Sequence, residues 1–213
     1  MSKSCGAVIF DLGRVLIDYD WSVSLKRLCR WTALAPEEAE RRILGQESIA
    51  RFETGQLSEA DFHAHVEESI GAHLPFGEFE AVWNSIFTGE IVPVARVARA
   101  AAVSGGLRFA VLSNTNETHV RFLRRTWPLL NELPNVFLSN EIRRRKPDPL
   151  AYRHVLERIG AGPEETLFVD DLPHNIAAAR TLGLQTIHVT SPEQAVEALA
   201  EYGLTADGKA PSA

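Results

Sequence analysis

The stretch that decides the fold lies near the start of the chain and reads Gly6-Ala7-Val8-Ile9-Phe10-Asp11-Leu12-Gly13-Arg14-Val15-Leu16. An unbroken apolar run from Ala7 to Phe10 ends there in the carboxylate of Asp11. A short apolar run between turn residues is typical of a strand that is buried on both faces of a parallel sheet. Ligands of such sheets bind beyond the carboxyl ends of the strands, and a buried carboxylate without a partner is costly. Asp11 is therefore either a functional residue or a residue that caps its own turn.

The composition is that of an ordinary globular protein. The chain has 213 residues, 45% of them hydrophobic, and a formal net charge of -6. The acidic balance argues against general electrostatic binding to nucleic acid or to an anionic membrane. No apolar run reaches the roughly 20 residues of a membrane-spanning helix, and Cys5 and Cys29 form neither a metal-ligand spacing nor a disulfide framework. The first strand follows the N-terminus too closely to leave room for a signal peptide, so we expect a cytoplasmic location.

Residues 18–89 carry helical rather than strand patterns. Apolar side chains recur at helical spacing, for example Phe62, Val66 and Ile70 after the N-cap candidate Ser58. No strand pattern interrupts the region, so we expect a helical insertion. The expected division of the chain is an α/β core over residues 1–17 and 90–205, a helical cap over 18–89 and a tail over 206–213.

Strand and helix patterns alternate from Pro93 onward. Alternation of this kind predicts a doubly wound parallel sheet with helices on both faces, which is an α/β fold of the Rossmann-like type. The expected helices cover residues 93–104, 117–126, 143–159, 177–182 and 192–202, and the expected strands cover 108–112, 136–138, 166–169 and 185–189.

Polar side chains follow four of the expected strands, and together they suit phosphoryl transfer. Asp11 is a carboxylate nucleophile that can form an acyl-phosphate. Asp170 and Asp171 add hard oxygen ligands of the kind that Mg²⁺ prefers. Lys146 offers a positive charge and Ser113 a hydroxyl for phosphate oxygens. Each motif alone is also consistent with a helix cap or a solvated loop, and it is their order at successive strand ends that favours a shared site.

The order of these motifs resembles the haloacid dehalogenase-like hydrolase superfamily over nearly the whole chain. The matching segments are Phe10-Asp11-Leu12-Gly13-Arg14-Val15, Val111-Leu112-Ser113-Asn114-Thr115, Arg145-Lys146-Pro147 and Phe168-Val169-Asp170-Asp171. The amino-acid sequences of these segments are most similar to those of the sugar-phosphatase branch that includes α-D-glucose-1-phosphate phosphatase. The resemblance implies a phosphomonoesterase that acts on a small phosphorylated metabolite, with a sugar phosphate as the expected substrate, beneath a cap that closes over it.

The resemblance also implies roles for individual residues. Asp11 would be the catalytic nucleophile, and Lys146 and Ser113 the further catalytic residues. The implied phosphate-binding residues are Leu12, Gly13, Ser113, Asn114 and Lys146, and the implied Mg²⁺ ligands are Asp11, the backbone carbonyl of Gly13, Asp170 and Asp171.

One position departs from the family pattern. Most phosphatases of the family have a second Asp two residues after the nucleophile as general acid and base, and this chain has Gly13 there. Glycine keeps the backbone carbonyl but cannot transfer a proton, and such a group contributes roughly 10²–10⁴ in rate. Asp18, Asp20 and His174 are candidates for a replacement, although each is also an ordinary surface residue.

Two other functions remain open from the sequence. A metal-free dehalogenase also uses an Asp nucleophile and lacks the second Asp, but the pair Asp170-Asp171 suits a cation better. A catalytically weak protein that binds a phosphorylated ligand is the third possibility, in which Gly13 marks lost activity. In every case we expect a small-molecule partner, no nucleic acid or membrane, and a monomer or homodimer.

Overall fold

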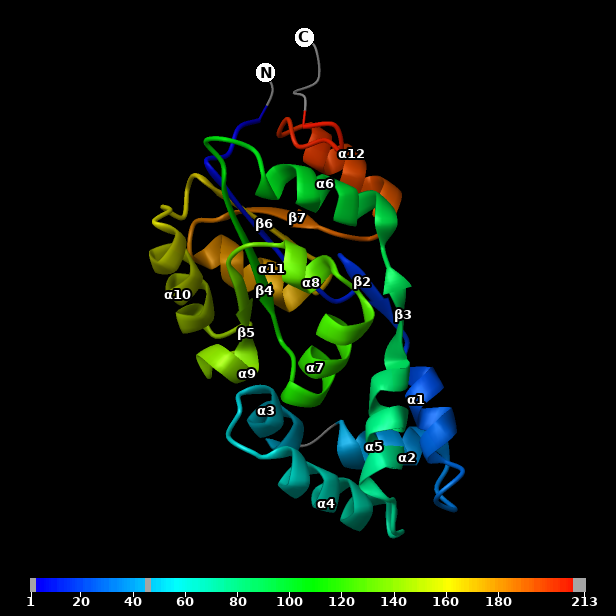
Figure 1. The fold of residues 1–213 in the computed structure, drawn as a ribbon. Helices are drawn as coiled ribbons and strands as arrows, with labels where there is room; N and C mark the ends of the chain where they lie inside the picture. Colours follow the sequence, from blue (N-terminus) through cyan, green and yellow to red (C-terminus); the bar gives the residue numbers. More distant parts are fainter. Residues whose placement is uncertain (1–2, 45–46, 209–213) are drawn as a thin grey trace.

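The computed structural model describes residues 3–44 and 47–208 and contains a five-stranded parallel sheet in the order β5-β4-β1-β6-β7 (Figure 1). The strands are Ala7–Phe10 (β1), Arg108–Ser113 (β4), Val136–Leu138 (β5), Thr166–Asp170 (β6) and Gln185–His188 (β7). The central strand β1 pairs with β4 on one side and with β6 on the other, so that Phe10 lies beside both Val111 and Val169. The expected α/β fold with a parallel sheet is confirmed.

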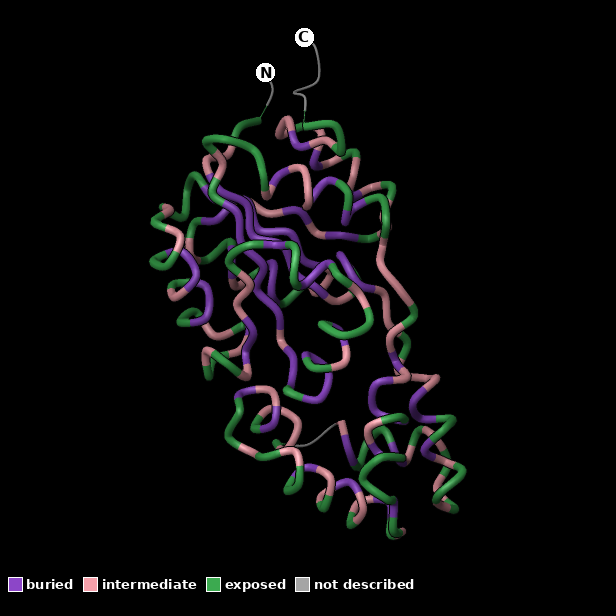
Figure 2. The backbone as a smooth tube through the Cα atoms, viewed as in Figure 1, coloured by how far each residue is buried: buried purple, intermediate pink, exposed green. Residues whose placement is uncertain are grey.

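Helices cover both faces of the sheet because the central strand β1 is apolar at every position and the middle positions of β4 and β6 are apolar as well. Val8 and Phe10 point into one hydrophobic core, and Ile9 points into the other. The first core is closed by Val92–Ala102 (α6), Glu117–Thr126 (α7), Leu129–Glu132 (α8) and Pro192–Ala200 (α12). The second core is closed by Pro149–Ile159 (α10) and Pro173–Thr181 (α11). All four residues of β1 are fully buried, and the sheet runs through the buried centre of the molecule (Figure 2).

The insertion after the first strand has a hydrophobic core of its own. Its helices are Trp21–Leu28 (α1), Pro36–Ile43 (α2), Glu47–Glu53 (α3), Glu59–Ile70 (α4) and Phe76–Trp83 (α5), followed by the short 3-10 helix Asn84–Ile86 (η1). Phe52 and Phe62 stack at its centre with ring centroids 4.2 Å apart. The Ser58 side chain accepts a hydrogen bond from the Asp61 backbone N–H and caps α4, as the sequence indicates. Figure 1 shows these helices at the end of the molecule beyond the carboxyl ends of the strands.

One structural feature differs from the sequence-based expectation for the insertion. Ile17–Tyr19 (β2) and Phe87–Glu90 (β3) form a two-stranded antiparallel ribbon where the insertion joins the core. Three- and four-residue strands have too few positions to show alternation, so their pairing depends on tertiary contacts rather than on a local pattern.

The helix expected from residue 143 begins instead at Pro149, after the short helix Ser139–Ile142 (α9). The segment between them is an ordered loop that the Asn114 side chain holds. Its Nδ2 donates a hydrogen bond to the Lys146 carbonyl at 2.8 Å, and its Oδ1 accepts one from the Lys146 N–H at 2.8 Å. The helical conformation is also disfavoured for a residue before proline, which agrees with the position of Lys146 outside a helix.

No helix within residues 3–44 and 47–208 is long and apolar enough to cross a membrane. Part of the expected tail, residues 209–213, lies outside the described residues.

Candidate active site

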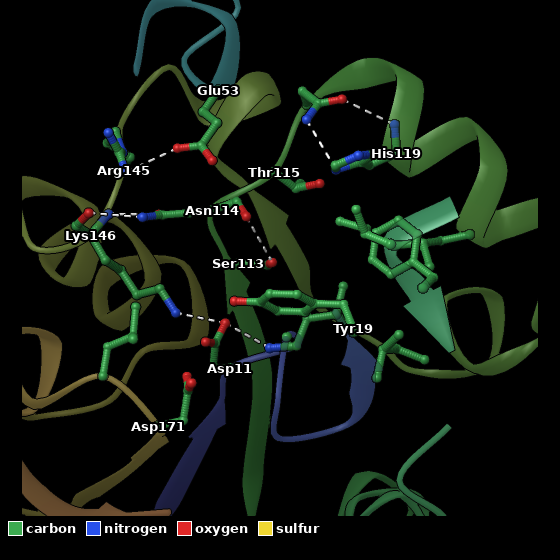
Figure 3. Close-up of a pocket in the computed structure, with 18 of the residues that line it drawn as sticks. Asp11, Tyr19, Glu53, Ser113, Asn114, Thr115, His119, Arg145, Lys146 and Asp171 are labelled. Carbon is green, nitrogen blue, oxygen red and sulfur yellow. Dashed lines mark hydrogen bonds and ion pairs between the residues drawn. The ribbon is translucent and has the colours of Figure 1, made fainter. Parts of the chain in front are cut away.

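The carboxyl ends of three neighbouring strands bring the expected polar residues together. Asp11 directly follows β1, Ser113 ends β4 and Asp170 ends β6, while the loop after β5 and α9 supplies Lys146. These side chains are almost completely withdrawn from solvent, since Asp11 is 6% exposed, Lys146 1% and Asp170 0%. Asp11, Ser113, Lys146 and Asp171 line one pocket between the sheet edge and the insertion (Figure 3).

Lys146 links the first and the fourth motif. Its Nζ lies 2.7 Å from Oδ1 of Asp11 and 2.7 Å from Oδ2 of Asp170. Burial alone would disfavour the charged amine, but attraction to the two carboxylates raises the pKa of Lys146 above its usual value. The amine is therefore a fixed positive charge at the floor of the pocket.

The carboxyl of Asp11 is buried close to two other carboxylates, those of Asp170 and Asp171. Burial is the largest cause that raises the pKa of this carboxyl, the charges of Asp170 and Asp171 raise it as well and Lys146 opposes them, and the resulting pKa is about 8. The Leu12 backbone N–H donates a hydrogen bond to Asp11 Oδ1 at 2.7 Å, which fixes the plane of the carboxylate. A bound cation is the simplest way to keep this carboxylate ionised.

The donor atoms around Asp11 fit a divalent cation. Asp11, Asp170 and Asp171 each offer a carboxylate oxygen, and these oxygens all lie within 4.8 Å of one another. Asp170 is already bonded to Lys146 and to Asn175, whose Nδ2 donates to both carboxylate oxygens at 3.1 Å. Those bonds orient the Asn175 amide, and its buried Oδ1 then has no hydrogen-bond partner within the described chain. Hard oxygen atoms in this number suit Mg²⁺, with Asp171 freer to coordinate than Asp170.

Gly13 faces an aromatic ring rather than open space. A Cβ atom at Gly13 would lie 2.7 Å from Cε1 of Tyr19, which is closer than real Cβ atoms approach a neighbour. The φ angle of Gly13 is not in the left-handed region, so packing rather than backbone conformation excludes a side chain here. Tyr19 lines the pocket, and burial together with the charges of Asp171 and Asp11 raises the pKa of its phenol to about 12.

The three expected replacements for the missing acid lie elsewhere. The Asp18 carboxylate accepts a hydrogen bond from Arg14 Nη1 at 3.2 Å, and the Asp20 carboxylate caps α1 by accepting one from the Ser22 N–H at 2.8 Å. His174 is exposed on α11. None of these residues lines the pocket that contains Asp11.

Two charged residues of the pocket are not evident from the sequence. Arg145 of the Lys146 loop forms an ion pair with Glu53 of α3, with Nη2 and Oε2 separated by 3.0 Å (Figure 3). Burial raises the pKa of Glu53, while Arg145 and Lys146 oppose that rise. The run Arg143-Arg144-Arg145-Lys146 predicts a solvated loop, and only its last two residues face the pocket. The ion pair joins the insertion to the core beside the site.

The side of the pocket toward the insertion is apolar and aromatic. It is formed mainly by Trp21, Ile49, Ile86, Phe87, His119 and Leu123. His119 stacks against Trp83, and its Nε2 shares a hydrogen bond with the Trp83 carbonyl at 3.2 Å. Burial lowers the pKa of His119 to about 3, so the ring is neutral at physiological pH. The pocket therefore has a strongly charged end at Asp11 and an aromatic wall at Trp21, Phe87 and His119, with the Glu53–Arg145 ion pair beside it.

Comparisons with known proteins agree with this architecture. The family model of haloacid dehalogenase-like hydrolases matches residues 6–183. The chain is 32% identical over 199 residues to a sesquiterpene phosphatase from Aspergillus oryzae, with 89% of this chain and 92% of that protein covered. It is 25% identical to a D-ribitol-5-phosphate phosphatase from Bacteroides thetaiotaomicron, with 84% of this chain and 89% of that protein covered.

A solved structure gives the same result. A haloacid dehalogenase family enzyme from Bacteroides thetaiotaomicron has a TM-score of 0.76 and 25% identity, with 87% of this chain and 94% of that chain covered. Another structure of that enzyme contains magnesium and inorganic phosphate. The chain described here belongs to the haloacid dehalogenase-like hydrolase family. The expectation of a hydrolytic enzyme of the phosphatase type is confirmed by this membership and by the phosphatases among its relatives.

Proposed function

We propose that the protein is a Mg²⁺-dependent phosphomonoesterase that acts on a small phosphorylated metabolite through an aspartyl-phosphate at Asp11. The observation that carries this proposal is the position of Asp11 at the end of the central strand. Its carboxylate lies 2.7 Å from the Lys146 amine and within 4.8 Å of the Asp170 and Asp171 oxygens. Few chemistries other than phosphoryl transfer use a carboxylate nucleophile, a fixed cation and a cluster of hard oxygen donors together.

Residues of the chain supply most parts of the reaction. A carboxylate oxygen of Asp11 attacks the phosphorus atom, and the bond to the alcohol oxygen breaks. Lys146 Nζ and the Ser113 hydroxyl bind the phosphate oxygens, with Asn114 holding the Lys146 backbone in place. Water then attacks the phosphorus and releases inorganic phosphate, which regenerates Asp11. The residues that would hold Mg²⁺ are Asp11, Asp171, Asp170, whose carboxylate is also paired with Lys146, and Gly13 through its backbone carbonyl. The bound ion would offset the repulsion between the carboxylates and the phosphate.

The nature of the alcohol is the finer part of the proposal. A sugar or sugar-alcohol phosphate is the first candidate, supported by the motif resemblance and by the D-ribitol-5-phosphate phosphatase among the relatives. An apolar alcohol is the second candidate, because Trp21, Phe87 and neutral His119 form one end of the pocket. The sesquiterpene phosphatase among the relatives supports that second class. The phosphate group would bind at the Asp11 end in both cases.

A phosphate-release screen tests the proposal. The purified protein is assayed with sugar phosphates, sugar-alcohol phosphates and a prenyl monophosphate, with Mg²⁺ and with excess chelator. We expect phosphate release that requires Mg²⁺ and is abolished by Asp11→Asn. Asp18→Asn is the matched control, because Asp18 is exposed and does not line the pocket. Absence of phosphate release from every substrate would leave the binding-protein alternative in its place.

The same preparation separates the other alternative. A metal-free dehalogenase would release halide from a 2-haloacid in the presence of chelator, and the proposal expects no halide release. Cytoplasmic location and a monomeric or homodimeric state remain predictions of the sequence.

A further inference from the structure

Tyr19 occupies the place from which the family's second Asp would act. The ring lies against Gly13, so close that even a methyl group at Gly13 would overlap Cε1. A carboxylate at residue 13 and an aromatic ring at residue 19 therefore exclude one another in this backbone. The glycine at residue 13 and the ring at residue 19 are therefore sterically linked in this structure.

The backbone fixes the ring in this position. The chain turns back after Gly13, and the Arg14 N–H donates a hydrogen bond to the Ile17 carbonyl at 2.8 Å. β2 then pairs with β3, with Tyr19 opposite Phe87. The guanidinium of Arg14 lies over the Tyr19 ring, 5.9 Å from its centre. The pairing of β2 fixes the backbone of Tyr19, and contact with Gly13 and Arg14 limits where the ring can lie.

The hydroxyl of Tyr19 is available to a ligand. Figure 3 shows it directed into the pocket on the side of Asp11 and Ser113. In the parts of the chain that the structure describes, no protein group forms a hydrogen bond with it, although the Tyr19 backbone N–H and carbonyl are both bonded. A phenol is a hydrogen-bond donor at neutral pH.

Two other titratable side chains that line the pocket, Glu53 and His119, are already engaged. Glu53 is paired with Arg145 at 3.0 Å. The two ring nitrogens of His119 interact with Asn116 Nδ2 at 3.1 Å and with the Trp83 carbonyl at 3.2 Å. Unlike Glu53 and His119, Tyr19 carries a hydroxyl that is unengaged within the described chain and is directed toward the Asp11 end of the pocket.

We propose that the Tyr19 hydroxyl takes over the role of the absent Asp and gives its proton to the departing oxygen of the substrate. This inference rests on the proposed phosphatase function. As the Asp11–phosphorus bond forms and the phosphorus–oxygen bond of the ester breaks, the proton moves from Tyr19 to the alkoxide, and the alcohol leaves. The phenolate then takes a proton from the water that attacks the aspartyl-phosphate. Both the alcohol and inorganic phosphate are thereby accounted for, and Tyr19 and Asp11 return to their starting forms.

The dependence on the leaving group tests this role. Tyr19→Phe keeps the ring against Gly13 and removes only the hydroxyl, so it should fold as the parent does. The value of kcat/KM is measured for alkyl phosphates and for p-nitrophenyl phosphate, whose phenolate leaves without a proton. We expect Tyr19→Phe to lower kcat/KM by roughly 10²-fold for alkyl phosphates and by less than about threefold for p-nitrophenyl phosphate. Tyr202→Phe, remote from the pocket, is the matched control and should change neither value.

Three outcomes of this experiment would lead to different conclusions about the phosphatase function and about the role of Tyr19. A parent enzyme inactive on all of these esters contradicts the proposed function itself. An active parent whose Tyr19→Phe variant loses the same factor with every ester overturns the proton-donor role, because phosphate binding or packing would act on all substrates alike. Leaving-group dependence in Glu53→Gln instead of Tyr19→Phe would also overturn it and assign the role to Glu53.

A steric exchange gives a second test. Gly13→Asp should lower activity while Tyr19 is present, because its Cβ meets the ring. Gly13→Asp combined with Tyr19→Ala should be more active toward alkyl phosphates than either single variant, since the ring then no longer occupies the space of the carboxylate. Higher activity of Gly13→Asp alone would contradict the mutual exclusion.

Discussion

Acid should destabilise the fold through His119, well before its ordinary carboxylates are protonated. His119 is buried and neutral, and burial lowers its pKa from 6.5 to about 3. The unfolded chain binds a proton at this residue below pH 6.5, whereas the folded chain does not. The stabilising contribution is therefore complete above pH 6.5 and is lost as the pH falls from 6.5 toward 3. Between pH 8 and pH 5 this one residue should lower the free energy of unfolding by about 2 kcal/mol.

Urea unfolding at pH 8 and at pH 5 measures the effect. The parent is compared with His119→Gln, which removes the titrating ring, and with His174→Gln, which removes an exposed histidine from α11. The loss of stability on going to pH 5 should be smaller by about 2 kcal/mol in His119→Gln than in the parent. His174→Gln should lose as much as the parent does. Equal losses in the parent and in His119→Gln would refute the reasoning, because His119 would then be free to take up a proton in the folded state.

Two further predictions concern the charged end of the pocket. Asp171→Asn should raise the Mg²⁺ concentration needed for half-maximal binding by more than about tenfold when binding is measured by calorimetry. The control variant Asp18→Asn should leave that concentration unchanged. Equal Mg²⁺ affinities of the parent and Asp171→Asn would exclude Asp171 as a ligand. Lys146→Met should abolish phosphatase activity and lower the free energy of unfolding at pH 8 by about 3 kcal/mol, because it leaves the Asp11 and Asp170 carboxylates buried without their cation. An unfolding free energy equal to that of the parent would contradict this explanation.

The core of the fold could be predicted because its signals are local. Short apolar strands such as Ala7–Phe10 are recognisable one at a time, and parallel pairing then places their carboxyl ends together. Asp11, Ser113, Lys146 and Asp170 meet in the structure for this reason. The metal and catalytic roles of these residues remain predictions, since position alone does not measure them.

The remainder of the pocket depends on contacts between segments far apart in the sequence. Glu53 reaches the site only because α3 packs near α9 and the Lys146 loop. Tyr19 gains its place from the ribbon of β2 and β3, whose strands are too short to predict. His119 is a single histidine on an amphipathic helix, and nothing in its sequence neighbours indicates that Trp83 covers it. The sequence around residues that the insertion positions therefore does not indicate that they line the pocket.

The most direct test of Asp11 as the phosphoryl acceptor is to determine whether the oxygen atom of the attacking water ends in the released phosphate or in Asp11. The parent enzyme is given an excess over substrate for a single turnover in heavy-oxygen water, with Mg²⁺ and the best substrate of the screen. Water that attacks the phosphorus of an aspartyl-phosphate leaves its oxygen in the released phosphate, and quenching early in the turnover should trap a phosphoryl group on Asp11. We predict labelled phosphate, unlabelled Asp11 and a trapped phosphoryl group on the peptide that contains Asp11. Labelled Asp11 would indicate attack at the carbonyl of an ester, as in a dehalogenase, and labelled phosphate without any phosphoryl group on Asp11 would show direct attack by water; either result would contradict Asp11 as the phosphoryl acceptor.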